Sequence, residues 1–307
     1  MADRAVFPLV PRHRLIGLAF GAVESVRRGR GSDVAGSRLY RSGDPVQAID
    51  WKASARLSTT RGSDEFVVLE RHAEEAPRVV VLVDRRPEMA LYPVDSPWLC
   101  KPAAVATAVD LIVGSTRAAH GLLGYLDLAG SEQEHFWLPP RSQADAAEVG
   151  RRLEAAPFDA PADGVPRGLA QLERLRRDLP AGSFVFVVSD FLEPPPPEAW
   201  SRAQARRWEL VPVVVQDPTW EQDFPAIASI VTPLVDPVRG RLSYVRLSRT
   251  EVEARGADNR ARRARLLAEL EARELAPVLI DSHDPDAILR RFVEWSERRG
   301  SSRGRVW

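Results

Sequence analysis

Short apolar runs alternate with amphipathic stretches from residue 78 almost to the end of the chain. The apolar runs predict buried strands over 79–83, 122–126, 184–188, 210–215 and 277–280. The stretches between them predict helices over 102–119, 144–155, 166–177, 197–207, 250–273 and 285–298. Because uniformly apolar strands need cover on both faces, we expect an α/β fold with a doubly wound, mostly parallel sheet and right-handed crossovers.

Two segments interrupt this alternation. Residues 135–138 predict an antiparallel strand at one edge of the sheet. Residues 230–247 contain the segments SIVTPLV and RLSYVRL on either side of DPVRG, which predicts a β-hairpin insertion.

The first 75 residues differ from the rest because they are rich in glycine and arginine and form only short segments. Residues 15–27 have a helical period, GRGSDVAGSRLY has the small residues of a bulged strand, and residues 65–70 predict a strand. Asp44 followed by Pro45 predicts the start of a short helix over 44–55. The predicted domains are a β-rich extension over 1–75, an α/β domain over 76–300 and a tail over 301–307.

The amino-acid composition disfavours several classes of function and of cellular location. Lys and Arg number 43 and Asp and Glu number 43, so no overall field draws the protein to nucleic acid or to an anionic membrane. The single cysteine, Cys100, excludes an internal disulfide and a thiolate metal cage, which fits a reducing compartment. The early apolar run over 15–23 is shorter than the roughly 20 residues that span a bilayer, and arginines follow it. We therefore expect a cytoplasmic protein without a signal peptide.

Sequence motifs of common enzyme classes are missing. The chain has no GxSxG elbow, no phosphate-binding glycine loop before a lysine, and no HExxH. Five histidines lie far apart in sequence: His13, His72, His120, His135 and His283. These observations favour a protein that is not an enzyme.

Acidic residues follow two of the predicted strands. Asp84 and Asp190 come directly after strands, and Glu88 lies four residues beyond Asp84. Since ligands of doubly wound folds bind at the carboxyl ends of the strands, these oxygens could hold a hard cation such as Mg²⁺. The alternative is that the acids cap helices or pair with Arg85 or Arg86.

A second group of charged and aromatic residues occupies 39–56, LYRSGDPVQAIDWKASAR. Its charged members are Arg41, Asp44, Asp50, Lys52 and Arg56, interleaved with Tyr40, Ile49 and Trp51. One interpretation is an internal ion-pair network, with Trp51 pinning the extension to the sheet domain. The other is an exposed surface on which a partner docks.

Several of these motifs together resemble a known family. VVVLVDRRPEM, the helix that opens with Lys101, and FVVSDFLEP resemble a von Willebrand factor A-like domain. With GSRLYRSGDPVQAIDWKASAR, they resemble the bacterial family called domain of unknown function 58, and the signature includes Gly43, Asp44, Asp50, Trp51, Lys52 and Arg56. The resemblance implies a MoxR-type AAA+ ATPase as the partner. Gln47 stands where the family usually has arginine.

The metal motif of that fold is altered in this chain. The fold uses Asp-x-Ser-x-Ser, whereas these positions are Asp84, Arg86 and Glu88, and Val165 stands where a threonine is usual. An arginine there repels a dication, so we predict that Arg86 replaces the metal and bridges Asp84 and Asp190. No cofactor is then expected, with Mg²⁺ as the alternative.

Three functions follow from these observations. The leading one is a non-enzymatic interaction or adaptor protein that works with a MoxR-type ATPase in protein remodelling or maturation. The second is a metal-dependent hydrolase or phosphotransferase that uses Asp84, Glu88 and Asp190. The third is a metal-dependent ligand-binding module.

Overall fold

The structure is a computed structural model that describes residues 5–11, 18–41, 46, 49–61, 66–92, 95–130, 135–142, 146–237, 239 and 241–303. Its elements are, in order, β1 (Leu18–Leu39), α1 (Trp51–Arg61), β2 (Val67–Ala76), β3 (Arg78–Val83), the 3₁₀ helix η2 (Pro87–Ala90), α2 (Lys101–Ala118), β4 (Leu122–Asp127), β5 (Phe136–Ser142), α3 (Ala146–Ala155), α4 (Gly164–Arg174), β6 (Phe184–Ser189), α5 (Pro197–Ala205), β7 (Glu209–Val215), β8 (Val231–Val235), β9 (Leu242–Arg246), α6 (Arg249–Ala272), β10 (Val278–Ile280) and α7 (Pro285–Arg303).

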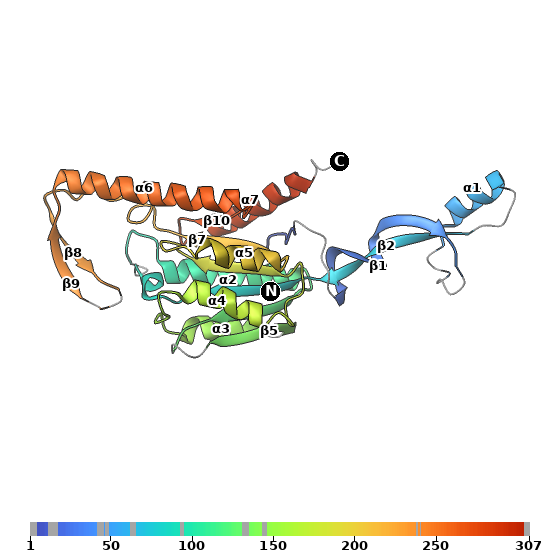
Figure 1. Ribbon diagram of the computed structural model, residues 1–307, viewed down its shortest axis with the longest axis horizontal. Coiled ribbons are helices and arrows are strands. Elements are labelled where there is room, and N and C mark those ends of the chain that lie inside the picture. The colour runs from blue at the N-terminus through green and yellow to red at the C-terminus, as the bar shows by residue number, and fades with distance from the viewer. Residues whose placement is uncertain are drawn as a thin grey trace.

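A six-stranded sheet forms the centre of the molecule, with strand order β10-β7-β6-β3-β4-β5 (Figure 1). The first five of these strands are parallel to one another, and β5 pairs antiparallel with β4 at the edge. The α/β class, the mostly parallel sheet and the antiparallel edge strand are thus confirmed.

Helices cover both faces of this sheet. Val79, Val81 and Val83 of β3 are buried in one apolar cluster together with residues of α2, α3 and α7. Val80 and Leu82 of the same strand are buried in a second cluster with residues of α4, α5 and α6. Because successive side chains of a strand point to opposite faces, the uninterrupted apolar run of β3 fills two cores at once.

The N-terminal segment contributes to one of these cores. Phe7 is 2% exposed, and its ring stacks on Phe292 of α7 with the centroids 4.5 Å apart. Phe7 also meets Trp295 edge to face, and Leu9 is buried in the same cluster. Residues near the start of the chain therefore pack on the sheet domain, a contact that the domain division at residue 75 does not foresee.

The two strands β1 and β2 form an antiparallel ribbon that projects from the sheet domain and carries α1 at its far end (Figure 1). Its register shifts between Gly29 and Val34 and again before Gly36, so the bulged strand predicted there is confirmed. The helical period predicted over 15–27 is wrong from Leu18 onward, because β1 begins at that residue.

The hairpin prediction over 230–247 is confirmed, since β8 and β9 pair antiparallel as a separate two-stranded sheet. The hairpin extends from the start of α6, on the opposite side of the molecule from the N-terminal ribbon (Figure 1). Ser248 and Glu251 form a reciprocal capping box at that end of α6. None of the described helices has the length and apolar character needed to cross a bilayer.

Candidate functional site

The carboxyl ends of the five parallel strands form an edge rich in aspartate. An aspartate ends or closely follows each of these strands: Asp84, Asp127, Asp190, Asp217 and Asp281. The edge of a parallel sheet is where ligands of this fold class bind. The partners of these carboxylates therefore decide what the edge can bind.

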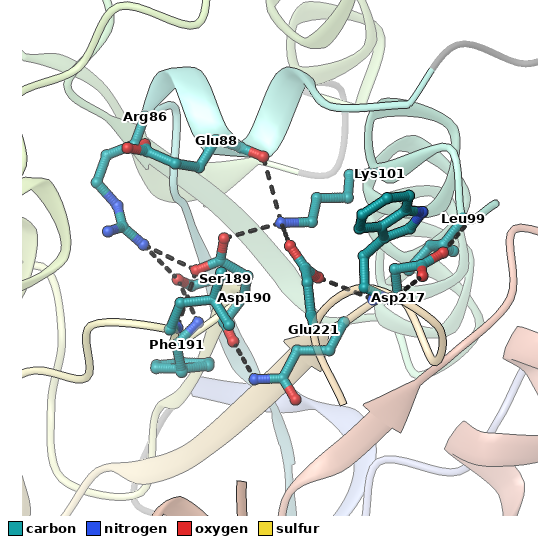
Figure 2. A network of polar contacts seen from close by, with 12 residues as sticks. Arg86, Glu88, Leu99, Lys101, Ser189, Asp190, Phe191, Asp217 and Glu221 are labelled. Carbon is teal, nitrogen blue, oxygen red and sulfur yellow. Dashed lines mark hydrogen bonds and ion pairs between the residues drawn. The ribbon is translucent and has the colours of Figure 1, made fainter. Parts of the chain in front are cut away.

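Arg86 lies between Asp84 and Asp190, the two aspartates that the sequence analysis names as candidate ligands. Its Nη2 donates to Asp190 Oδ1 at 2.9 Å (Figure 2). The same Nη2 donates to Asp84 Oδ2 at 2.8 Å, and Nε donates to Asp84 Oδ2 at 3.0 Å. Ser189 completes the site because its hydroxyl donates to Asp84 Oδ2 at 2.7 Å. All four residues are buried. This is the bridge that the sequence predicts, with a guanidinium between two carboxylates.

Lys101 provides a second cation on the other side of Asp190. Its Nζ lies 2.9 Å from Asp190 Oδ2 and also pairs with Glu221 Oε1 (Figure 2). It donates a further bond of 3.2 Å to the backbone carbonyl of Glu88. Glu88 thus contributes its backbone, and not the carboxylate that the metal prediction requires, to the contact with Lys101. We call Asp84, Arg86, Lys101, Ser189, Asp190 and Glu221 the ion cluster.

Burial and the neighbouring charges shift the pKa values of three groups in the ion cluster. Burial disfavours the charged Arg86, but the hydrogen bond and charge of Asp84 and the charge of Asp190 outweigh it and raise the pKa of Arg86. Burial also opposes ionisation of Asp190, yet Lys101 and Arg86 together lower its pKa. The pKa of Glu221 is raised, since burial and the nearby Asp190 outweigh its contact with Lys101.

The ion cluster does not fit a divalent cation. The carboxylate oxygens of Asp84 and Asp190 that would face a metal already accept hydrogen bonds from Arg86 and Lys101. At an effective dielectric constant of about 20, a dication about 4 Å from one guanidinium is repelled by roughly 8 kcal/mol. Among the described residues, no three acids, histidines or cysteines lie together as a ligand set.

The neighbouring Arg85 enters a separate buried group around Asp127. Its Nη2 donates to the hydroxyl of Tyr125 at 3.3 Å, and that hydroxyl donates to Asp127 Oδ2 at 2.9 Å. Arg152 of α3 donates to the same carboxylate through Nε at 2.9 Å. Arg85 and Arg86 therefore lie beside different aspartates, and each guanidinium makes hydrogen bonds within the chain.

The sequence analysis does not identify three residues in or beside the ion cluster as site residues: Lys101, Asp217 and Glu221. Asp217 accepts hydrogen bonds from the backbone amides of Leu99, Thr219 and Trp220 at 2.7–2.8 Å. Glu221 accepts the amide of Asp217 at 2.8 Å. The available signal was the acid that follows VPVVVQ, which repeats the pattern after the other strands. Lys101 gives no such signal, because lysine is rarely buried.

The signature over 39–56 divides into a structural half and an exposed half. Asp50 caps α1, since its Oδ1 accepts the amides of Lys52 and Ala53 at 3.0 Å. Ser54 is buried, and its hydroxyl accepts the amide of Val67 in β2 at 2.8 Å. The helix therefore begins at Trp51, whereas the sequence predicts a start at Asp44, which lies outside the described residues together with Gly43 and Pro45.

The exposed half is aromatic and basic. Trp51 is 60% exposed and meets Phe66 edge to face at 5.9 Å, and Tyr40 meets Phe66 in the same way at 6.4 Å. Lys52 on α1 is exposed beside them, as are Arg41 and Arg56. We call Tyr40, Arg41, Trp51, Lys52, Arg56 and Phe66 the arm surface. The prediction that Trp51 pins the extension to the sheet domain is wrong, because α1 lies at the far end of the ribbon (Figure 1).

Fold and site together define a class: an α/β protein with a mostly parallel sheet whose acidic edge is closed by its own arginine and lysine. A profile of the family described as protein of unknown function DUF58 matches residues 36–265. The chain belongs to this family.

The chain is similar to two mycobacterial proteins and to two solved structures. Uncharacterised proteins of Mycobacterium tuberculosis (Rv1480) and Mycobacterium bovis (Mb1516) are each 28% identical over 225 residues, which is 73% of this chain and 67% of theirs. A solved structure of the conserved hypothetical protein BatB from Bacteroides thetaiotaomicron aligns with a TM-score of 0.42 at 15% identity, over 72% of this chain and all of that one. An aerotolerance-related membrane protein from Bacteroides fragilis aligns with a TM-score of 0.44 at 13% identity, over 73% of this chain and all of that one.

Proposed function

We propose that this chain is a non-enzymatic interaction protein that docks a partner on the arm surface. The observation that carries the proposal is the exposure of Trp51, at 60%, within a cluster of aromatic and basic side chains. Tryptophan, tyrosine and arginine are the residues that dominate binding energy at protein interfaces. A tryptophan so exposed on a short helix has little structural role of its own.

The division of the signature supports this role. Asp50 and Ser54 hold α1 against β2 through the cap and the bond to Val67. This leaves Trp51 and Lys52 on a helix whose position is fixed before a partner arrives. Preorganisation of this kind reduces the entropy cost of binding.

The ion cluster supports the interaction role because it disfavours the two metal-dependent alternatives. A metal-dependent hydrolase or a metal-dependent ligand-binding module would need a cation at Asp84 and Asp190, where Arg86 and Lys101 now lie. No described feature of the sheet edge favours either alternative.

The identity of the partner comes from the family resemblance. We propose a MoxR-type AAA+ ATPase, with the pair acting in remodelling or maturation of a third protein. We also propose that the sheet domain is von Willebrand factor A-like, because Asp84 and Asp190 follow the strands expected for that fold. A reducing cytoplasmic location fits the single cysteine, Cys100, which is buried.

The experiment is a binding titration between the full chain and the MoxR-type ATPase of the same host. Trp51→Ser is expected to weaken binding at least about tenfold, because a central tryptophan contributes about 2 kcal/mol or more. Tyr244→Ser, which changes another exposed aromatic residue far from the arm, is the matched control and should bind like the wild type.

Two results would refute the proposal in different ways. If the wild-type chain does not bind the ATPase, the assigned partner is wrong. If it binds and Trp51→Ser binds equally well, the arm surface is not where the partner docks.

A further inference from the structure

The β8–β9 hairpin presents an apolar face to solvent. Cross-strand pairs place Val231 opposite Arg246, Pro233 opposite Tyr244 and Val235 opposite Leu242. These residues alternate along their strands, so they share one face of the ribbon. The exposed fractions are 58% for Val231 and Val235, 53% for Leu242 and 71% for Tyr244.

The other face of the hairpin differs. Thr232 and Leu234 of β8 and Val245 of β9 are half-buried. At the base of the hairpin, Leu247 is buried and accepts a hydrogen bond of 2.7 Å from the amide of Ser229. One face of the hairpin is thus half-buried, and the opposite face is exposed to solvent. An open face of this kind marks an interaction site.

The edge of β8 is protected against pairing with another strand. Asp236 donates its amide to Arg241, and hydrogen-bonded pairs alternate from there along the hairpin. Pro233 therefore lies at a position where an amide would point away from β9, and proline removes that donor. Recognition must use the outward side chains, or the free edge of β9, and not strand addition at β8.

Charge surrounds the apolar face. The segment over 229–247 contains three arginines and one aspartate: Arg239, Arg241, Arg246 and Asp236. Arg239 and Arg241 are exposed at the turn end, and Arg246 is exposed at the base. The apolar stretch from Val231 to Val235 thus spans roughly 14 Å between two basic ends.

We propose that this face binds an extended protein segment that has apolar side chains at alternate positions and carboxylates at both ends. The alternate apolar residues would pack on Val235, Leu242 and Tyr244. The carboxylates would pair with the exposed Arg239 at the turn end and with Arg246 at the base. Such charge complementarity also selects against basic segments.

Other occupants fit the face less well. A hairpin that enters a bilayer needs an apolar tip, whereas this turn carries Arg239 and Arg241. A second copy of the chain placed face to face would bring the arginines at the ends of the two faces together. The acidic protein segment is the occupant that both the apolar pattern and the charge favour.

The proposal extends the interaction role to a second partner, because the hairpin and the arm surface lie at opposite ends of the molecule (Figure 1). It does not depend on the arm surface. Trp51→Ser is therefore a control that should leave hairpin binding unchanged, so that failure of one proposal can be told apart from failure of the other.

The test uses the full chain and a labelled synthetic peptide, Glu-Glu-Val-Thr-Leu-Thr-Val-Glu-Glu, followed by fluorescence anisotropy. We expect saturable binding that weakens at least about tenfold when lysines replace the four glutamates. Leu242→Ser with Tyr244→Ser should abolish binding. Ser243→Ala, between these residues on the other face, should keep it. Thermal unfolding checks that the variants remain folded.

Each other result would overturn the proposal. Absence of saturable binding at millimolar peptide, or equal binding of the lysine peptide, would refute the acidic segment. Co-sedimentation with phosphatidylglycerol vesicles that depends on Tyr244, without peptide binding, would assign the face to a membrane. A dimer that Tyr244→Ser dissociates, again without peptide binding, would assign it to a second copy.

Discussion

The ion cluster at the sheet edge and the arm surface are both dense in charged side chains, but they use them in opposite ways. At the sheet edge, Asp84 and Asp190 are buried and paired with Arg86 and Lys101. On the arm, Trp51 and Lys52 are exposed to solvent. The first region pairs its charges within the chain, whereas the second exposes Trp51 and Lys52 to solvent.

This difference shows why a charged motif cannot be assigned a function from its composition alone. Both regions contain acids and bases at close spacing in the sequence. The strands of the sheet carry their polar ends into a packed core, where an unpaired charge is costly and must find a partner. On α1, by contrast, Trp51 and Lys52 are exposed, so these two side chains lie in solvent.

Among the variants that compare the two regions, Lys101→Met is expected to lower the free energy of unfolding most. The change removes the cation between Asp190 and Glu221, so that Glu221 loses its buried ion pair and Asp190 keeps only the pair with Arg86. We expect the free energy of unfolding to fall by about 3–5 kcal/mol. Urea denaturation measures this fall, with Lys52→Met on the exposed face of α1 as the matched control. A loss as small as that of the control would mean that Lys101 does not balance the cluster.

Ser189→Ala is expected to lower the free energy of unfolding by a smaller amount. The hydroxyl donates to Asp84 at 2.7 Å inside the buried site, so its loss leaves one lone pair of the carboxylate unsatisfied. The expected destabilisation is about 1–3 kcal/mol. Ser201→Ala, on the exposed side of α5, provides the control in the same denaturation experiment. Equal stability of the two variants would contradict the geometry of the site.

The pH dependence of stability distinguishes the two acids that share Lys101. The raised pKa of Glu221 means that the folded state holds more protons than the unfolded state above the ordinary value of 4.5. The free energy of unfolding therefore falls as pH rises through that window. Asp190 has a lowered pKa, so its contribution is present above its ordinary value of 3.8 and is lost as pH falls below it.

Glu221→Gln should consequently flatten the stability profile above pH 4.5 and leave the acid limb below 3.8 in place. Denaturation midpoints measured across this range give the profile. A variant that retains the wild-type slope above pH 4.5 would show that Glu221 has an ordinary pKa.

The smallest effect on stability is expected for Trp51→Ser. Since the ring is 60% exposed and contacts Phe66 only at its edge, the free energy of unfolding should change by no more than about 0.5 kcal/mol. A large loss, measured in the same urea series, would return Trp51 to a structural role and would erase the difference between the two regions.

Much of the sheet domain could be predicted because its strands are unambiguous. VVVLV and FVFVV are short runs that are apolar throughout, which is typical of strands covered on both faces. The contact of Arg86 with Asp84 and Asp190 was also predictable, because an arginine stood where a cation was expected.

Other features depend on tertiary structure that no local pattern encodes. The segment from Leu18 has a helical period but pairs with β2 as a ribbon, so pairing overrides propensity there. The start of α1 was misplaced because Asp44 and Asp50 are equally good caps by sequence. The role of Lys101 could not be predicted, because its partners Asp190 and Glu221 lie 89 and 120 residues away along the chain.

Isothermal titration calorimetry of Mg²⁺ and Mn²⁺ into the purified, metal-stripped chain tests most directly whether Arg86 occupies the position of a cation. If Arg86 occupies that position, no saturable heat depends on Asp84, so the wild-type chain and Asp84→Ala should give the same flat titration. Tight binding to the wild-type chain that Asp84→Ala abolishes would contradict it, and would return the sheet edge to the metal-dependent functions.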